Sequence, residues 1–420
     1  MSTMDRRSLL RLGLGATGAL LLAGGYAGYE VTRAGSLVEG RPVASGLRRL
    51  VVIEMAGGND GLSMVVPYAD PRYPALRRNT AIEPERVHPI DAAVGFHPAL
   101  AELARRGAAV VAGVGTANPD LSHFEMLQRW WTGDPDGRTR PGTGFLGRLC
   151  DVIGDPAAPA VGVSLGLGPT QALACRRATT LSVDTGSAAG FPDFSEDPGV
   201  QRAWIAAQRA MAHPDRRDSA LVSTARASVA TALTFSDAVA RLPAAAGGYP
   251  ESDLGAQLEL AARLLSDENI GLRIVHVPMT DDFDTHEDHL SRYQAIMADF
   301  DRCLESFRVD LQQRGLADSV LVATMSEFGR RVPDNGSSGN DSSGLDHGTA
   351  SVALLIGPVN SGVFGASPSL ADLDADGNLK ASVNMAEFYA TIAESWFGIP
   401  ANEVLGGSPR PIEGIVNVLK

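Results

Sequence analysis

Short apolar runs alternate with longer amphipathic stretches along most of the chain. The apolar runs are rich in Val, Ile and Leu, which is typical of strands buried on both faces of a sheet. They lie at residues 50–55, 109–114, 160–165, 272–277, 320–323 and 351–356, with a shorter run at 173–174. Between them, stretches at 122–133, 143–153, 287–315 and 385–397 predict helices. The alternation predicts an α/β fold, organised as one large domain or two smaller ones.

Residues 186–268 depart from this alternation. A segment rich in Pro, Gly and Asp leads into three Ala-rich helical stretches, near 198–212, 217–242 and 252–266, with almost no strand-like run. We therefore expect a mainly helical insertion that packs as a cap over one face of the sheet. No group of catalytic residue types occurs in it, so its expected role is to shape access to a site elsewhere.

Polar side chains follow four of the predicted strands. Strand ends fix such groups while loops vary, which is why ligands bind at this edge of open α/β sheets. Carboxylates and imidazoles are donors for divalent metals, and a guanidinium binds phosphate-like anions, so we expect a metal site, an anion site or both. The groups are Asn59, Asp60, Ser122, His123, Asp284, His286, Glu327, Arg330, Asp346 and His347.

The densest group of metal-binding residue types lies between residues 281 and 289. Four Asp and two His occur within these nine positions, directly after a strand. An exposed helix start would also favour acidic residues, because carboxylates stabilise the positive end of the helix dipole. That alternative explains Glu287 and Asp288 but not the histidines. We expect Asp284 and His286 to be metal ligands.

Ser122 begins a predicted helix at the end of a strand. Glu125 lies three residues later, which completes a capping-box pattern, so capping alone would explain the serine. It does not explain His123. Because helix N-termini also attract anions, we expect Ser122 and His123 to face whatever occupies the cleft.

The N-terminal residues have the pattern of a twin-arginine export signal. Arg6 and Arg7 precede an uncharged, Gly- and Ala-rich run from Leu12 to Tyr29, whose glycines make it a poor membrane-spanning helix. We expect a signal peptide at residues 1–27, a linker at 28–47 and the α/β domain at 48–420. Removing residues 1–27 takes the net charge from −13 to −15. The expected product is an acidic periplasmic or extracellular protein without a stable membrane span.

Composition excludes several other classes of protein. The net charge of −13 argues against a nucleic-acid partner bound through its phosphates. The three cysteines, Cys150, Cys175 and Cys303, form no C-x-x-C pair, so a thiolate zinc site is not indicated. We expect them to be buried apolar side chains, although one pair could form a disulfide outside the cytosol.

Several motifs together resemble one exported bacterial family, domain of unknown function 1501. They follow the twin-arginine start in the family's order between residues 50 and 357, and they read VVIEMAGGNDGLSMVVPY, GFHPAL, SHFEMLQRWWTG, TGFLGR, DFDTHEDH and SEFGRRVPDNG followed by DHG. That family resembles distant members of the alkaline phosphatase and sulfatase superfamily. The resemblance implies an alkaline-phosphatase-like, three-layer α/β/α sandwich with a divalent-metal site.

The superfamily pattern also implies roles for individual residues. Asp60 stands where the first strand ends in a metal-binding acid, and His286 pairs with Asp282 or Asp284 in the later cluster. Glu327 keeps the acid of the S-D-H-G strand end, whereas Phe328 replaces its histidine. The last superfamily histidine is matched by His347, and we also expect Asp346 beside it to be a ligand.

The nucleophile position of the superfamily departs from its usual residue types. It falls on His123, with Ser122 one residue before it. Ser122 could shift into place, His123 could act as nucleophile or ligand, a metal-bound water could do the chemistry, or there could be no such chemistry.

Three classes of function follow. The first is an exported hydrolase of phosphate or sulfate esters that uses zinc, manganese, calcium or iron, with Arg330 clamping the substrate anion. The second is a catalytically silent binding protein on the same fold. The third is an exported partner of another envelope protein.

Overall fold

The computed structural model describes residues 29–32, 47–138, 142–155, 157–166, 168–183, 197–245, 247–336 and 343–416. The signal peptide expected at residues 1–27 and most of the expected linker lie outside these ranges.

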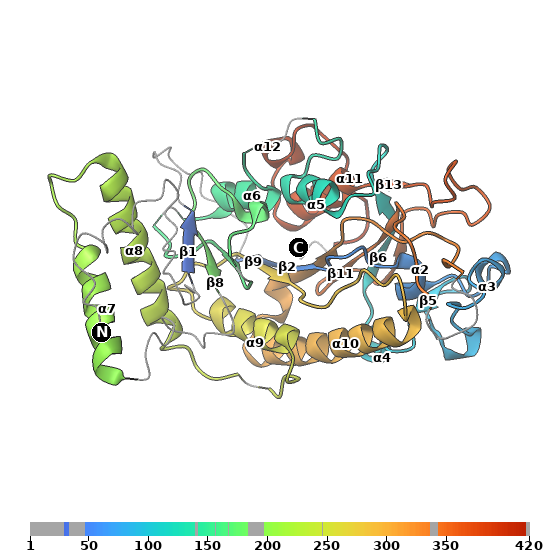
Figure 1. Cartoon of the computed structure of the whole chain (residues 1–420), viewed down its shortest axis with the longest axis horizontal. Coiled ribbons are helices and arrows are strands. Elements are labelled where there is room, and N and C mark those ends of the chain that lie inside the picture. The colour runs from blue at the N-terminus through green and yellow to red at the C-terminus, as the bar shows by residue number, and fades with distance from the viewer. Residues whose placement is uncertain are drawn as a thin grey trace, which may run out of the picture.

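A ten-stranded sheet forms the centre of the molecule (Figure 1). In spatial order its strands are β1 (Tyr29–Thr32), β8 (Thr180–Val183), β7 (Gly162–Ser164), β9 (Ile274–Pro278), β2 (Arg49–Glu54), β10 (Val320–Met325), β11 (Ser351–Ile356), β6 (Ala109–Gly115) and β12 (Gly362–Phe364), with β13 (Val383–Asn384) also paired to β6. Neighbouring strands from β8 to β10 pair in parallel, whereas β1 pairs with β8, and β11 with both its neighbours, in antiparallel fashion. The sheet is therefore mainly parallel, as α/β alternation predicts.

Helices cover both faces of this sheet (Figure 1). One face carries α5 (His123–Thr132), α6 (Phe145–Ile153), α11 (Met385–Ala390), which continues as a π-helix to Trp396, and α12 (Ala401–Val404). The other face carries α4 (Ala101–Arg106), α9 (Asp253–Leu265) and α10 (His289–Gln313). The expected three-layer α/β/α sandwich is confirmed.

The sequence of β2 shows why the sheet lies between two helical layers. Val51 and Ile53 belong to the hydrophobic core under α9 and α10, and Leu50 and Val52 belong to the core under α5 and α11. Successive side chains of a strand point to opposite faces, so an unbroken apolar run is stable only where both faces are covered.

Two helices lie beyond the edge of the sheet that ends in β1 and β8 (Figure 1). They are α7 (Pro198–Met211) and α8 (Ala220–Val239), drawn in green, and they occupy two of the three helical stretches expected in residues 186–268. The third stretch is α9, which packs beside α10 on the sheet face.

Shorter elements complete the described part of the chain. They are a small antiparallel sheet of β3 (Val65–Val66), β5 (Gly95–Phe96) and β4 (His88–Pro89), the short helices α2 (Gly61–Met64) and α3 (Arg72–Leu76), and the 3₁₀ turns Pro84–Arg86, Gln171–Leu173 and Ala317–Ser319.

One strand expectation is wrong. Residues 173–174 were expected as a short strand, but Leu173 ends a 3₁₀ turn whose start is capped by the side chain of Thr170. Leu173 is apolar because it is buried against α6, and a two-residue apolar run cannot distinguish a buried turn from a strand. The strand of this region is β8 instead.

Strand directions bring the polar loops to one edge. Because β2, β9, β10 and β6 run the same way, the loops after them leave the sheet on the same side. The reversed strand β11 begins there, so the segment before Ser351 lies at the same edge.

Among the described residues, no helix combines the length and the apolar character needed to cross a bilayer.

Candidate metal centre

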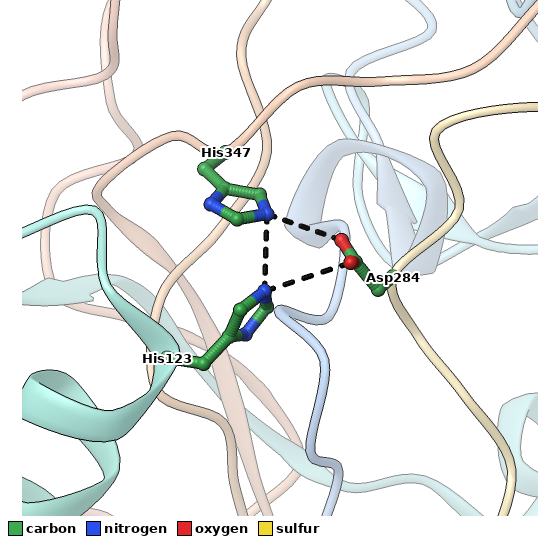
Figure 2. A group of neighbouring side chains, drawn as sticks. All are labelled: His123, Asp284 and His347. Atoms are coloured by element: carbon green, nitrogen blue, oxygen red, sulfur yellow. Dashed lines mark hydrogen bonds and ion pairs between the residues drawn. The ribbon is translucent and has the colours of Figure 1, made fainter.

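Three side chains from distant segments meet at the carboxyl edge of the sheet (Figure 2). His123 is the first residue of α5, Asp284 lies in the loop after β9, and His347 precedes β11. The Nε2 atom of His347 is 3.0 Å from Nε2 of His123 and 3.1 Å from Oδ1 of Asp284. The Nε2 atom of His123 is 3.6 Å from Oδ2 of Asp284. One donor atom of each residue thus lies within 4.8 Å of the other two.

A third imidazole, that of His286, adjoins this group. Its Nε2 atom lies 3.1 Å from Nε2 of His347 and 3.0 Å from Oδ1 of Asp284. The side chain is 45 % exposed, more than those of the other three residues, so it lies at the open side of the centre.

The far nitrogen of each imidazole contacts an oxygen. Nδ1 of His123 is 2.7 Å from Glu327 Oε1, and Nδ1 of His347 is 2.9 Å from the carbonyl oxygen of Leu121. Nδ1 of His286 is 3.3 Å from Asp346 Oδ1. Carbonyl and carboxylate oxygens only accept hydrogen bonds, so these contacts assign the proton to Nδ1. In the neutral imidazoles the Nε2 atoms then carry lone pairs.

Lone pairs that converge in this way could hold a metal ion between them. Nε2 of His347 has two imidazole nitrogens and a carboxylate oxygen within 3.1 Å. An added proton on His347 could bridge to only one of these neighbours. A divalent metal satisfies all of them at once, and three imidazoles with a carboxylate suit zinc, manganese or iron. Imidazoles held by an oxygen at their far nitrogen are also the usual arrangement around protein metals.

Glu327 lies behind His123. Its side chain is buried, and its carboxylate accepts hydrogen bonds from the backbone N–H of Gly57 at 2.7 Å and from the hydroxyl of Ser326 at 3.1 Å. The carbonyl oxygen of Glu327 accepts a bond from the indole of Trp130 in α5 at 3.1 Å. The hydrogen bond from His123 to Glu327, only partly opposed by burial, raises the pKa of His123.

Arg330 is buried and donates to the loops around the centre. Nε donates to Gly58 O at 2.9 Å, and Nη1 donates to Leu345 O at 2.9 Å. Nη2 contacts Gly57 O, Phe283 O and Oδ1 of Asp284. Partial burial would raise the pKa of Asp284, but the hydrogen bond and charge of Arg330 outweigh it, and the pKa is lowered. The guanidinium is thus engaged with protein oxygens at each nitrogen.

The turn at Gly57 and Gly58 lets these loops approach closely. Both residues have positive φ, and a Cβ on Gly57 would lie 2.6 Å from the backbone nitrogen of Asp284. Any larger residue at Gly57 would displace the loop that carries Asp284.

Asp60 lies outside the group of three. Its carboxylate is fully buried and forms a bidentate ion pair with Arg77, and Nε2 of His289 lies 3.5 Å away. Arg77 also donates to the carbonyl oxygens of Arg331 and Val332. Burial would raise the pKa of Asp60, but the charge of Arg77 outweighs it and the pKa is strongly lowered. The structure therefore places this sequence-predicted ligand in a buried ion pair.

Ser122 is exposed at the N-cap of α5, but its side chain makes no capping hydrogen bond, so the expected capping box is wrong. Glu125 instead pairs with Arg129, one turn along the helix, at 3.1 Å. Asp346 is half exposed, and within the described part of the centre its carboxylate contacts only the far nitrogen of His286.

Sequence reasoning missed two parts of the centre. The Leu121 carbonyl that orients His347 has no sequence signal, because any residue supplies a carbonyl. Phe328 was noted only as a missing histidine, yet its buried ring packs 4.9 Å, centroid to centroid, from both His123 and His347.

The fold and site together define an α/β protein with a histidine-rich candidate metal centre at the carboxyl edge of its sheet. The chain belongs to the family described as "Protein of unknown function (DUF1501)", whose model matches residues 92–408. The family expected from the sequence is therefore confirmed. No curated protein matches the chain significantly.

Several solved structures are similar at low identity. The lipoteichoic acid synthase LtaP from Listeria monocytogenes matches with 10 % identity and a TM-score of 0.41, over 89 % of this chain and 78 % of that one. The C-terminal periplasmic domain of EcEptC from Escherichia coli, in complex with Zn, matches with 12 % identity and a TM-score of 0.40, over 86 % of this chain and 87 % of that one. A protein in the alkaline phosphatase superfamily from Vibrio parahaemolyticus matches with 11 % identity and a TM-score of 0.39, over 94 % of this chain and 76 % of that one.

Proposed function

We propose that the protein is a metal-dependent hydrolase of phosphate or sulfate esters. The observation that supports this most is the convergence of the Nε2 atoms of His123, His286 and His347 on the carboxylate of Asp284, with each Nδ1 atom held by an oxygen. We assign His123, Asp284 and His347 as ligands and His286 as a fourth ligand at the exposed side.

A bound divalent ion supplies Lewis acidity, which neutralises charge on the ester oxygens and acidifies water. The residues around it have supporting roles. Glu327 fixes the ring of His123, and Asp346 fixes that of His286, so we propose that both carboxylates are positioning groups and not ligands. Arg330 holds Asp284 in place, which replaces the anion-clamp role expected from sequence.

Two sources of the nucleophile stay open. The hydroxyl of Ser122 is exposed, does not cap α5, and belongs to the residue before a proposed ligand. Water activated in the centre is the alternative. His123 is disfavoured as nucleophile because its Nε2 atom faces Asp284 and His347.

A catalytically silent binding protein is the second candidate. Phe328 favours it, since an apolar ring packs against two of the imidazoles where the superfamily pattern has a histidine. For both proposed functions we propose export by the twin-arginine pathway to the periplasm or the extracellular space. Neither function involves a nucleic-acid partner. A small anionic ester is the proposed substrate of the first, and an envelope protein is a further proposed partner.

Ester hydrolysis tests the proposal. Protein loaded with zinc, manganese, calcium or iron is assayed with p-nitrophenyl phosphate, bis-p-nitrophenyl phosphate and p-nitrophenyl sulfate. We expect turnover of at least one of them, loss of turnover with chelator, and a decrease of about 100-fold or more in Asp284→Asn, because this variant should lose most of the metal whose positive charge stabilises the transition state.

Two variants complete this assay. Ser122→Ala separates the nucleophiles, because it abolishes turnover by serine and spares turnover by water. His213→Ala, at an exposed histidine after α7, is the control and should match wild type. Stoichiometric metal without turnover of any ester would overturn the hydrolase and support the silent binding protein.

A further inference from the structure

A separate cavity of about 710 Å³ lies at the N-terminal end of α10. None of the proposed metal ligands lines it. Its walls come from the segment around the 3₁₀ turn Pro84–Arg86, the loop after β5 and the first turns of α10. Its polar and charged lining includes Glu83, Arg86, His97, Ser291 and Gln294, and Leu290 lies beside them.

Three hydrogen-bond donors in this cavity have no acceptor among the described residues. They are the guanidinium of Arg86, the side-chain amide of Gln294 and the Nε2 atom of His97. The imidazole of His97 is only 3 % exposed, and its Nδ1 accepts the backbone N–H of Ala99 at 3.1 Å. The proton of the neutral ring is therefore on Nε2. Water can reach Arg86, which is exposed, and Gln294, which is half-buried, but the ring of His97 is buried. A buried donor without a partner is costly, so His97 at the wall of a cavity favours an acceptor ligand there.

The start of α10 adds two backbone donors. This helix has 25 residues, and its N-cap Asp288 has a left-handed conformation and makes no side-chain capping bond. The N–H of His289 donates to Ser343 O at 3.1 Å, but those of Leu290 and Ser291 find no acceptor within the described ranges. Together with the partial positive charge of the helix end, they favour an anion.

The balance of charge sets the class of ligand. Arg86 is the one cationic side chain of the lining, and Glu83 is the one acid. Burial, and then the neighbouring His289 and Arg86, lower the pKa of His97 to about 4, so its ring is a neutral donor at pH 7. The charged side chains of the lining therefore cancel, and the partial positive charge at the start of α10 favours a single negative charge over two.

We propose that this cavity binds a singly charged oxyanion, a carboxylate or a sulfate ester group, of a small molecule. Arg86 faces the charge of the ligand, His97 and Gln294 donate to its oxygens, and the first turn of α10 supplies backbone N–H groups. The site is distinct from the metal centre and does not depend on the proposed hydrolase function.

Saturation-transfer NMR on the methyl protons of acetate and methyl sulfate tests the inference. The protein is treated with chelator, and the His347→Ala variant is measured in parallel, so that anion binding to a metal is excluded. We expect saturable binding with a dissociation constant in the millimolar range. Inorganic phosphate, largely a dianion at pH 8, should compete more weakly than methyl sulfate.

Matched arginine variants locate the binding. Arg86→Gln should raise the dissociation constant by about tenfold. Arg302→Gln removes the same charge from the exposed surface of α10, outside the cavity. This variant should change the dissociation constant less than about twofold. Arg86 is exposed, so both variants should keep the wild-type unfolding temperature.

The outcomes separate clearly. Tighter binding of acetate assigns a carboxylate ligand, and tighter binding of methyl sulfate assigns a sulfate ester. Absence of saturable binding, or equal binding by wild type and folded Arg86→Gln, overturns the inference. Neither result bears on the proposed metal-dependent hydrolase, because no metal is present in the experiment.

Discussion

The imidazoles of the centre are defined by the groups at their far nitrogens. His123, His286 and His347 each direct Nε2 inward because an oxygen holds Nδ1 outside. Glu327 is the most strongly fixed of these oxygens, being buried and bonded to Gly57 and Ser326 as well. A carboxylate in this position also makes the imidazole a stronger ligand.

Glu327→Gln should therefore weaken metal binding without unfolding the protein. We expect the metal dissociation constant to rise by about 10- to 100-fold, the usual cost of losing an outer-shell partner. Competition with a chromogenic chelator measures it. Glu54→Gln is the matched control, because Glu54 is also buried at a strand end and bonded to a histidine, His276, at 3.0 Å. Equal affinities for wild type and Glu327→Gln would contradict the role of Glu327.

His97 predicts part of the pH dependence of stability. Burial lowers its pKa to about 4, below the ordinary value of about 6.5. Between these values the unfolded chain binds more protons than the folded protein. The contribution of neutral His97 to the free energy of unfolding is therefore complete above pH 6.5, and it is lost as the pH falls toward 4.

Urea unfolding at pH 7 and pH 4.5 measures this contribution. Between pH 7 and pH 4.5, the free energy of unfolding of wild type should fall by about 2–3 kcal/mol more than that of His97→Gln, because only wild type has the shifted pKa of His97. The same loss in both proteins would show that His97 is not the group responsible.

At the scale of elements, strand direction assembles the centre. The loops after β6, β9 and β10 share an edge because these strands are parallel in direction. His347 joins them because β11 is reversed, and the bridge between Arg330 and His347 pairs the two loops. Sequence periodicity locates strands but not their order, so it placed polar groups at strand ends without selecting which of them meet.

Asp60 illustrates this limit. It follows a buried strand at the correct edge, like the proposed ligands, but Arg77 forms an ion pair with it. Nothing in the sequence around Arg77 signals that pairing, because the partner is brought close by α3 and the loop at residues 331–332.

Asp60→Asn and Asp284→Asn should therefore have different effects. Asp60→Asn leaves Arg77 buried without its anion, so we expect a loss of about 3–5 kcal/mol in the free energy of unfolding and unchanged metal content. Asp284→Asn should lose most of the metal. Urea unfolding and elemental analysis of both variants measure this. Loss of metal from folded Asp60→Asn would restore Asp60 as a ligand.

At the scale of the whole molecule, the alternation of apolar and amphipathic stretches predicted the α/β fold, and the family resemblance implied its three layers. Long, strongly apolar runs such as 320–323 became central strands, because burial on both faces leaves them no other stable place. Two short strands at or next to the ends of the sheet were missed. They are β8, with the sequence TLSV, which lies between β1 and β7, and the edge strand β12, and both are held by neighbours rather than by their own composition.

The candidate centre was predicted less completely than the fold. Asp284, His286 and His347 follow from residue type and position, and the structure brings them together with His123. The sequence could not predict which carboxylates are proposed ligands and which only hold an imidazole in place. That distinction depends on which nitrogen of each ring faces the surrounding loops.

The metal content of the protein tests the account most directly. Full-length protein purified without chelator is analysed for its elements, together with His347→Ala, His286→Ala and the control His213→Ala. We predict stoichiometric divalent metal in wild type and the control, a loss of most of it in His347→Ala, and a smaller loss in His286→Ala, whose ring lies at the exposed side. Absence of stoichiometric metal from wild type in every preparation, or equal content in wild type and His347→Ala, would contradict the account.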